Sequence, residues 1–101
     1  ENMPQHTIQV IARITAQAGN SHEVHSLLQA IVAPTRQESG CLNYRLYRNR
    51  NDPAVFVFIE EWSDEQAIIE HFRQPYMQTV SSKALPLLAE PPQIEQYELL
   101  V

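Results

Sequence analysis

The sequence predicts an α+β fold made of two consecutive strand–helix–strand halves. Apolar and polar residues alternate in the segment 6–15 and again from residue 41 onward, which is the two-residue period of a half-buried strand. Between such segments, apolar residues recur at helical spacing. Both glycines of the 101-residue chain, and most of its prolines, fall at the boundaries between these segments.

The first half begins with a strand over 6–15. Apolar side chains share one of its faces: Ile8, Val10, Ala12 and Ile14. A helix follows, for which Asn20 is the expected cap and Glu23 completes a capping box. Its apolar stripe is Val24, Leu27, Leu28, Ile31, Val32 and Thr35. We expect Pro34 to kink the last turns and Gly40 to end the helix.

The middle of the chain reads as an antiparallel hairpin. CLNYRLYRNR (41–50) is a strand, NRNDP (49–53) consists of turn-forming residues, and AVFVFIEEW (54–62) is the most β-prone segment of the chain. The last of these is apolar on both faces as far as Glu60, so we expect it near the centre of the sheet. The short turn indicates that the two strands pair directly.

The second half closes with a helix and a strand. Ser63 is the expected helix cap with Gln66 as its box partner, and Pro75 interrupts the helix before a second helical piece that reaches Leu88. PPQIEQYELLV (91–101) is the last strand. The order β-α-β-β-α-β is the ferredoxin-like pattern, with an antiparallel sheet and both helices on one face.

The length fits one domain over 1–101. Apolar residues are expected on both faces of its sheet: Ile11, Phe56, Phe58, Tyr97 and Leu99. Because the helices cover only one face, a second copy packed sheet to sheet would bury the other, and we expect a homodimer.

The composition excludes several functions. A net charge of -5, with only seven Lys and Arg, is unfavourable for binding a nucleic-acid backbone, and the group Arg45, Arg48 and Arg50 alone is a weak signal. Cys41 is the only cysteine, so an internal disulfide is excluded. The opening ENMPQHT has no apolar leader, and no apolar run is long enough to span a membrane. We expect a cytoplasmic protein.

Trp62 and His71 are the strongest candidates for chemistry. Trp62 ends a strand beside a helix start, where it either closes the core or forms the wall of a ligand pocket. His71 shares a helix face with Ile68 and Phe72, where it is either a satisfied core residue or a base. The ordinary pKa of histidine, about 6.5, suits proton removal from a phenol or hydroquinone.

Other polar groups carry weaker signals. Glu60 and Glu61 point to opposite faces of a strand, so they cannot act as a carboxylate pair; one is expected to be an edge charge and the other the partner of a basic residue. His22 and His25 have helical spacing but no third ligand nearby, so no metal site is expected. Cys41 has no neighbouring histidine to activate it. No Gly-rich dinucleotide or phosphate loop is present.

The chain resembles the antibiotic biosynthesis monooxygenase domain, including its quinol monooxygenase-like members. The matching pieces run in order over nearly the whole chain. They are APTRQESGCLNYRLY, NDP, FVFIEEW, SDEQAIIEHF and a following P-Y; the most specific features are E-S-G-C-L-x-Y, D-P, E-x-W and a later His.

The resemblance implies a dimeric α+β barrel built from ferredoxin-like protomers, each with a small pocket between sheet and helices. It also implies oxidation of a small aromatic, hydroquinone or polyketide-like substrate by O2 without any cofactor or metal. His71 and Trp62 match positions common in the family. Polyketide-oxidising members carry an Asn where this chain has Phe58. Haem-degrading members use an Asn, a Trp and a His at the places where this chain has Ala12, His71 and Ser81. Haem degradation is therefore not expected.

These considerations lead to one main functional hypothesis. His71 is the expected base, Trp62 and Phe72 the apolar walls of the site, and Tyr76 a polar contact in place of a second family histidine. One alternative is a non-catalytic dimer that binds a small ligand. Another is an isomerase or degrading enzyme for a small signalling metabolite.

Overall fold

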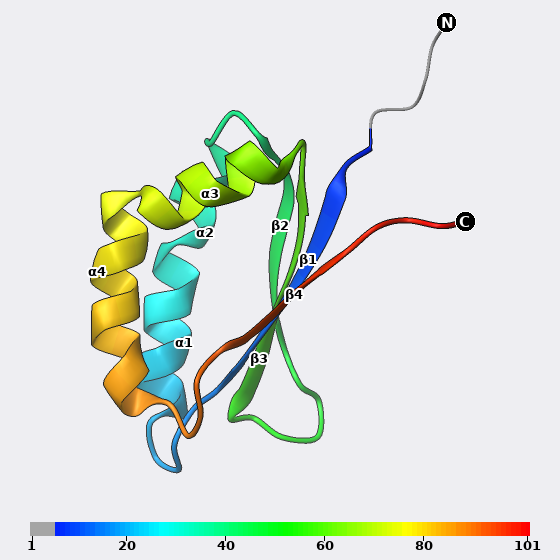
Figure 1. Ribbon diagram of the computed structural model, residues 1–101. Helices are drawn as coiled ribbons and strands as arrows, with labels where there is room; N and C mark the ends of the chain where they lie inside the picture. Colours follow the sequence, from blue (N-terminus) through cyan, green and yellow to red (C-terminus); the bar gives the residue numbers. More distant parts are fainter. Residues whose placement is uncertain (1–5) are drawn as a thin grey trace, which may run out of the picture.

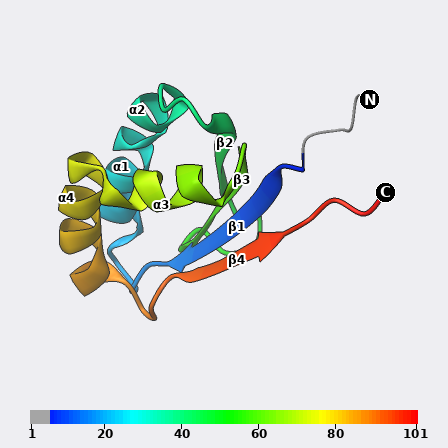
Figure 2. The same ribbon diagram turned by 45° about the horizontal axis from the view of Figure 1, so that its top comes forward.

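The computed structural model describes residues 6–101 and contains one four-stranded antiparallel sheet with the helices packed on one of its faces (Figure 1). The strands are β1 (Ile8–Thr15), β2 (Cys41–Arg48), β3 (Val55–Trp62) and β4 (Gln93–Tyr97). Their order is β2-β3-β1-β4, and Figure 2 shows β4 beside β1. The predicted ferredoxin-like α+β fold is confirmed. Within one chain the sheet is open, with β2 and β4 at its edges.

The position of β3 agrees with its sequence. It pairs with β1 on one side and β2 on the other, so both of its edges and its inner face are covered. Phe56 and Phe58 are buried against the helices, whereas Ile59 is exposed on the outer face. The outer face is therefore uncovered, although Phe56 and Phe58 do not contribute to it.

The helices are shorter than the sequence suggested. The expected first helix is divided into α1 (Ser21–Ala30) and α2 (Val32–Arg36). Pro34 explains the division, because its ring conflicts with the carbonyl four residues earlier, at Ala30, where α1 ends. Asn20 occupies the cap position without a side-chain hydrogen bond, so the predicted capping box is wrong.

The second helical region contains α3 (Glu65–Arg73), α4 (Pro75–Ala84) and a 3-10 turn, η1 (Leu85–Leu87). Asp64, and not Ser63, caps α3, because its side chain accepts a hydrogen bond from the Ala67 N–H. Pro75 begins α4, where its missing N–H costs nothing, and the preceding Gln74 is extended. This places α3 across the ends of β2 and β3.

The core lies between the inner sheet face and the helices. It includes Val10, Val24, Leu28, Tyr44, Phe56, Phe58, Trp62, Ile68 and Met77. Three residues with polar or ionisable side chains are buried with them: Thr35, Glu60 and His71. None of the helices described in residues 6–101 is long and apolar enough to cross a membrane.

Gly40 allows the segment before β2 to approach α3 closely. A Cβ added at Gly40 would lie 2.3 Å from the Ala67 Cβ and 3.0 Å from Ser63 Oγ. The Gly40 carbonyl also accepts a hydrogen bond from the Ser63 N–H at 2.9 Å. The contact holds the 37–40 segment against the start of α3, and this segment carries Glu38.

We predict that Gly40→Ala lowers the free energy of unfolding by about 1–3 kcal/mol, because the added methyl group overpacks this contact. Urea denaturation measures the change. Removing the opposing Cβ with Ala67→Gly in the same chain should recover part of the loss, apart from the helix cost of glycine of about 1 kcal/mol. Simple additivity of the two changes would contradict the contact.

Candidate functional site

His71 lies at the centre of the candidate site. It is on the inner face of α3, one turn after the buried Ile68, and only 1% of its surface is exposed. Its Nδ1 lies 3.0 Å from Oε2 of Glu38, which comes from the segment between α2 and β2. The sequence places these residues 33 positions apart; the packing of α3 against the 37–40 segment brings them together.

This contact fixes how the imidazole can act. A carboxylate only accepts hydrogen bonds, so Nδ1 is the nitrogen that carries the proton. Nε2 of neutral His71 then bears the lone pair. No hydrogen bond found among residues 6–101 involves Nε2, so it is available to a ligand. A histidine held in this tautomer by a carboxylate has the arrangement of a general base.

Glu38 has a second partner in Tyr76, at the start of α4. The Tyr76 hydroxyl donates to the same Oε2, and it lies 3.4 Å from Thr35 Oγ1. Burial, followed by the hydrogen bond to Glu38, raises the pKa of Tyr76 to about 12. Tyr76 therefore remains a hydroxyl near neutral pH and helps to position Glu38.

Aromatic rings surround His71 on several sides. The Trp62 ring centroid is 4.7 Å from that of His71, and those of Phe72 and Tyr44 are 5.1 and 5.6 Å away. Trp62 is fully buried, Tyr44 is nearly so, and Phe72 is partly exposed. These rings limit the movement of the imidazole and exclude water from much of its surface.

A cavity of about 120 Å³ opens next to His71, between the sheet and the helices. Its walls are mostly apolar and include Ala12, Leu28, Phe58, Phe72, Met77 and Val80. Four polar side chains also reach it: Tyr44, Glu60, His71 and Ser81. Small-molecule sites typically combine an apolar lining with a few convergent polar groups.

Glu60 is the unexpected member of this set. It lies on the inner face of β3 between Phe58 and Trp62, in register with Val10 and Tyr44 on the neighbouring strands. Only 4% of its surface is exposed, and its Oε1 accepts a hydrogen bond from the Trp62 indole N–H at 2.8 Å.

The surroundings of Glu60 favour its neutral form. Burial raises its pKa to about 7; the hydrogen bond from Trp62 opposes the rise and the charge of Glu38 adds to it. Neither ion pair found in residues 6–101 includes Glu60. Neither pair includes Glu61 either, so the expectation that one glutamate of the pair 60–61 meets a basic residue is wrong. Glu61 accepts a hydrogen bond from Thr7 on the other face.

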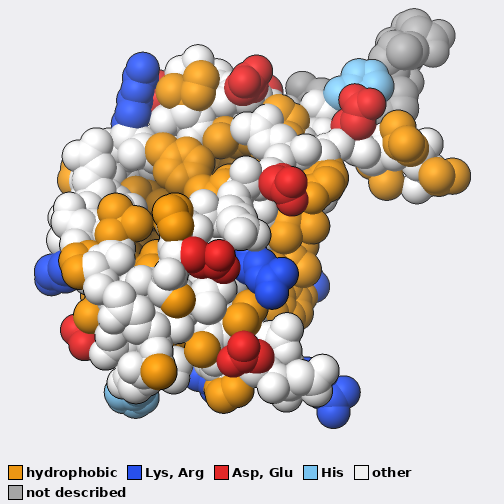
Figure 3. Space-filling model, turned by 60° about the horizontal axis from the view of Figure 1, so that its bottom comes forward, with side chains coloured by type: hydrophobic (Ala, Val, Ile, Leu, Met, Phe, Trp, Pro, Cys, Tyr) orange, Lys and Arg blue, Asp and Glu red, His pale blue; other side chains and the backbone are white. Residues whose placement is uncertain are grey.

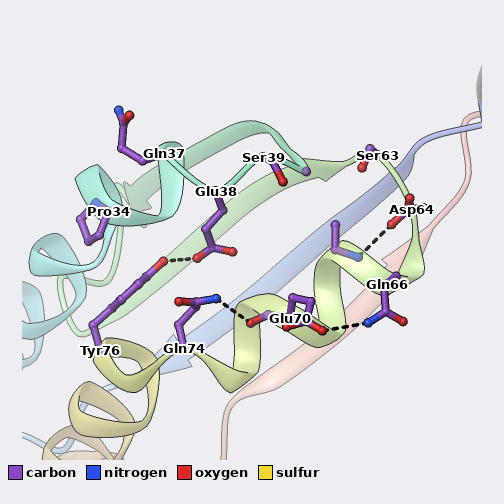
Figure 4. A pocket seen from close by; sticks show the side chains of 12 residues that line it. Pro34, Gln37, Glu38, Ser39, Ser63, Asp64, Gln66, Glu70, Gln74 and Tyr76 are labelled. Atoms are coloured by element: carbon purple, nitrogen blue, oxygen red, sulfur yellow. Dashed lines mark hydrogen bonds between the residues drawn. The ribbon is translucent and has the colours of Figure 1, made fainter.

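A second, more open hollow lies on the other side of Glu38 (Figure 4). It encloses about 610 Å³ and is lined by polar side chains of the 37–40 segment, α3 and the start of α4. In Figure 4 the Glu38 side chain extends toward Tyr76, and Gln74 and Glu70 lie nearby. Glu38 thus lies between this polar groove and the buried His71.

The family model described as "Antibiotic biosynthesis monooxygenase" matches residues 7–83. The chain belongs to this family. It is 32% identical over 92 residues to "Uncharacterized protein sll1783" of Synechocystis, covering 91% of this chain and 63% of that protein. It is 31% identical over 84 residues to "Putative monooxygenase Rv0793" of Mycobacterium tuberculosis, covering 83% and 82% of the two chains.

A solved structure agrees over the whole chain. The crystal structure of PA3566 from Pseudomonas aeruginosa has a TM-score of 0.90 and 34% identity, and the match covers 100% of both chains. Membership of the antibiotic biosynthesis monooxygenase family, together with these similarities, supports a general monooxygenase-like role.

The structure distributes the four expected site residues over different surroundings. His71 and Phe72 line the cavity. The Trp62 ring packs against His71, and its N–H donates a hydrogen bond to Glu60. Trp62 is not among the residues that line the cavity. Tyr76 lines the polar groove and reaches His71 only through Glu38.

Two residues of this family member were missed by sequence reasoning. Glu38 had no visible signal beyond its place in E-S-G-C-L-x-Y, because its partner His71 is distant in sequence. Glu60 did have a visible signal. It is an acidic residue at an inward position of an otherwise apolar strand, two residues before a tryptophan whose N–H needs an acceptor. A buried carboxyl there needs a donor, and the Trp62 indole on the same strand face supplies it.

The remaining candidates stay outside the site. In residues 6–101 no group of three or more His, Cys, Asp or Glu could hold a metal ion. His25 stacks on Phe56 and contacts Arg48. Burial and the charges of Glu38 and Glu60 raise the pKa of Cys41 to about 11, so its thiol remains protonated near neutral pH.

We predict that Glu60 makes the fold less stable as pH rises. Its pKa rises from 4.5 to about 7 on folding, so between these values the folded state holds a proton that the unfolded state has lost. The stabilisation is complete below pH 4.5 and is lost by about pH 7, a change of roughly 3 kcal/mol.

The variant Glu60→Gln removes this term, and its stability relative to the parent chain should increase from pH 5 to pH 8. Chemical denaturation at four pH values measures the difference. Glu61→Gln, on the opposite strand face, is the matched control and should run parallel to the parent. Parallel curves for Glu60→Gln would contradict the raised pKa.

Proposed function

We propose that the chain is a cofactor-independent monooxygenase that oxidises a small phenol or hydroquinone with O2. The observation that supports this most is the buried His71, whose Nδ1 is held by Glu38 while Nε2 remains available beside an apolar cavity. Removal of the phenolic proton by Nε2 gives an electron-rich anion that reduces O2 itself. Such a reaction requires a base, apolar walls and little water.

The size of the cavity favours a one-ring substrate over a polyketide-like one. An apolar cavity of about 150 Å³ is sufficient to bind benzene, and the cavity here is about 120 Å³. Phe72 is partly exposed at its lining and offers a ring face to an aromatic guest. The Tyr44 hydroxyl has its pKa raised by burial, so it can donate a hydrogen bond to a substrate oxygen.

We predict that His71→Ala decreases substrate-dependent O2 uptake by about 10²–10⁴-fold, the usual contribution of a general base. An oxygen electrode with a panel of phenols, catechols and hydroquinones gives the measurement, corrected for autoxidation in buffer. His22→Ala, an exposed histidine in the first turn of α1, is the control.

Unchanged uptake in His71→Ala would refute the base assignment. Parent protein that binds these compounds without consuming O2 would favour the alternative of a non-catalytic binding domain.

We also propose that two copies of the chain pair through the outer face of the sheet. Ile11 and Ile59 are direct neighbours across β1 and β3, and both are exposed. Tyr47 and Tyr97 on the edge strands are exposed too. Figure 3 shows hydrophobic side chains with charged ones among them. The hydrophobic side chains include a band along one side of the molecule.

The charges on this outer face suit pairing with an identical face. Arg13 and Arg45 alternate there with Glu61 and Glu95, so a two-fold arrangement can place opposite charges together. Burial of the isoleucine pair would add the apolar contact that a domain of this size lacks. The expected cytoplasmic location remains a prediction.

We predict that Ile59→Lys converts the dimer to a monomer, because the lysines would face each other in the centre of the interface. Sedimentation equilibrium measures the mass. Ile69→Lys is the matched control: Ile69 is 41% exposed against 42% for Ile59, but it lies on α3. A monomeric parent chain, or an unchanged dimer in Ile59→Lys, would refute the interface.

A further inference from the structure

Glu60 accepts a hydrogen bond from Trp62, and it is also placed to interact with a molecule bound in the cavity. The Trp62 N–H engages only Oε1. No hydrogen bond found among residues 6–101 involves Oε2. Since no fully buried side-chain oxygen among these residues lacks a partner, Oε2 is accessible, and Glu60 lines the same cavity as His71. A buried carboxyl whose second oxygen has no protein partner can exchange a proton or hydrogen bond with whatever occupies the cavity.

None of the groups found to face Glu60 in residues 6–101 is a Lys or Arg that would stabilise its charged form. From its own strand comes the Trp62 N–H; from β2 come the Tyr44 hydroxyl and, nearby, the Cys41 thiol. The 37–40 segment contributes the charge of Glu38, and α3 contributes His71. His71 is itself committed to Glu38 through Nδ1.

Trp62 connects the two titratable groups. Its N–H holds Glu60, and its ring lies against His71 with centroids 4.7 Å apart. A small guest in the cavity therefore meets a histidine and a carboxyl group from different elements, α3 and β3. A base and a carboxyl group that meet the same guest are the usual arrangement for combined acid and base work.

We propose that Glu60, as a neutral carboxylic acid, is the proton donor of the oxidation in which His71 is the base. This inference rests on the proposed function and deepens it, since it assigns the second half of the proton transfer. It also narrows the substrate class to uncharged one-ring phenols, because the residues that line the cavity include no Lys or Arg to pair with a carboxylate or phosphate on the ring.

The steps balance with O2 as the only oxidant. Nε2 of His71 takes the phenolic proton, and the ring carbon that carries hydrogen opposite the oxygen forms a C–O bond with O2. Glu60 donates its proton to the terminal peroxide oxygen. The Glu60 carboxylate then removes the hydrogen of that carbon as a proton, and the C–H electron pair becomes the new C=O bond.

The O–O bond breaks in the same step, and the departing hydroxide takes the proton that His71 had stored. The products are a quinone and one water, and both residues regain their starting protonation states. The net reaction is phenol plus O2 to quinone plus H2O, and the protein is neither oxidised nor reduced.

The test uses Glu60→Gln in the full chain. Gln keeps the shape of Glu60 and can still accept from Trp62, but it cannot release a proton. We expect phenol binding, followed by the fluorescence of the single tryptophan, to stay within about threefold of the parent. O2 uptake should decrease by about 10²–10³-fold. The parent rate should decrease as pH rises through about 7, and the variant should lack this decrease.

Two further variants complete the design. Glu61→Gln should match the parent in rate and pH profile. Glu60→Asp retains an acid at a greater distance from the cavity and should restore part of the rate together with the alkaline decrease. Infrared difference spectra at pH 6 supply a readout without turnover: the band of a protonated carboxylic acid should be present in the parent and Glu61→Gln and absent in Glu60→Gln.

The outcomes separate the two proposals. If the parent consumes O2 and Glu60→Gln keeps both the rate and the alkaline decrease, the donor role is overturned while the monooxygenase function stands. Absence of the acid band in the parent at pH 6 also overturns the donor role. A parent chain that consumes no O2 with any phenol overturns both proposals.

Discussion

The hydrogen bond between His71 and Glu38 is the interaction on which the site depends. An imidazole that is 1% exposed must find a partner for its N–H, since an unsatisfied buried donor costs about 1–3 kcal/mol. Glu38 provides it from a segment that reaches α3 only because residue 40 is glycine. Backbone packing at Gly40, the tautomer of His71 and the orientation of Nε2 are therefore linked.

The same requirement shapes the sheet side of the cavity. Phe58, Glu60 and Trp62 share the inner face of β3 because side chains alternate along a strand. Two of them are apolar and fill the core. The third is a carboxyl group that is kept in place by the indole two residues later. Glu60 is therefore the polar side chain that β3 contributes to a cavity whose lining is mostly apolar.

Sequence patterns predicted the fold well because each strand and helix is specified by local periodicity and punctuation. The central position of β3 followed from its apolar character on both faces, and the structure confirms it. Errors lay mainly at the ends of elements, where competing helix caps such as Ser63 and Asp64 differ by little in energy. The last strand, predicted over 91–101, is limited to Gln93–Tyr97, and Phe56 and Phe58 face the helices and not the open face of the sheet. Pro34 predicted an interruption of the first helix, but the interruption occurs at Ile31, about one turn earlier than expected.

The site was predictable only in part, since its key contacts join segments that are far apart in the chain. His71 and Trp62 were visible as unusual residues at inward positions. The role of His71 depends on Glu38, which contacts it directly, and Glu38 is in turn hydrogen-bonded by Tyr76; both contacts form through tertiary packing alone. The Glu60–Trp62 pair is local, with a spacing of two residues on one strand face, so it could have been recognised from the rule that buried polar groups pair.

The fold and the polar lining of the cavity are specified by largely separate sets of residues. The core residues of the sheet and helices set the position of the cavity, but only four polar side chains reach into it. A change at any of these would alter the acid–base properties of the cavity without altering the fold. If this cavity is the reaction site, as we propose, the residues at the positions of Tyr44, Glu60, His71 and Ser81 set its acid–base chemistry.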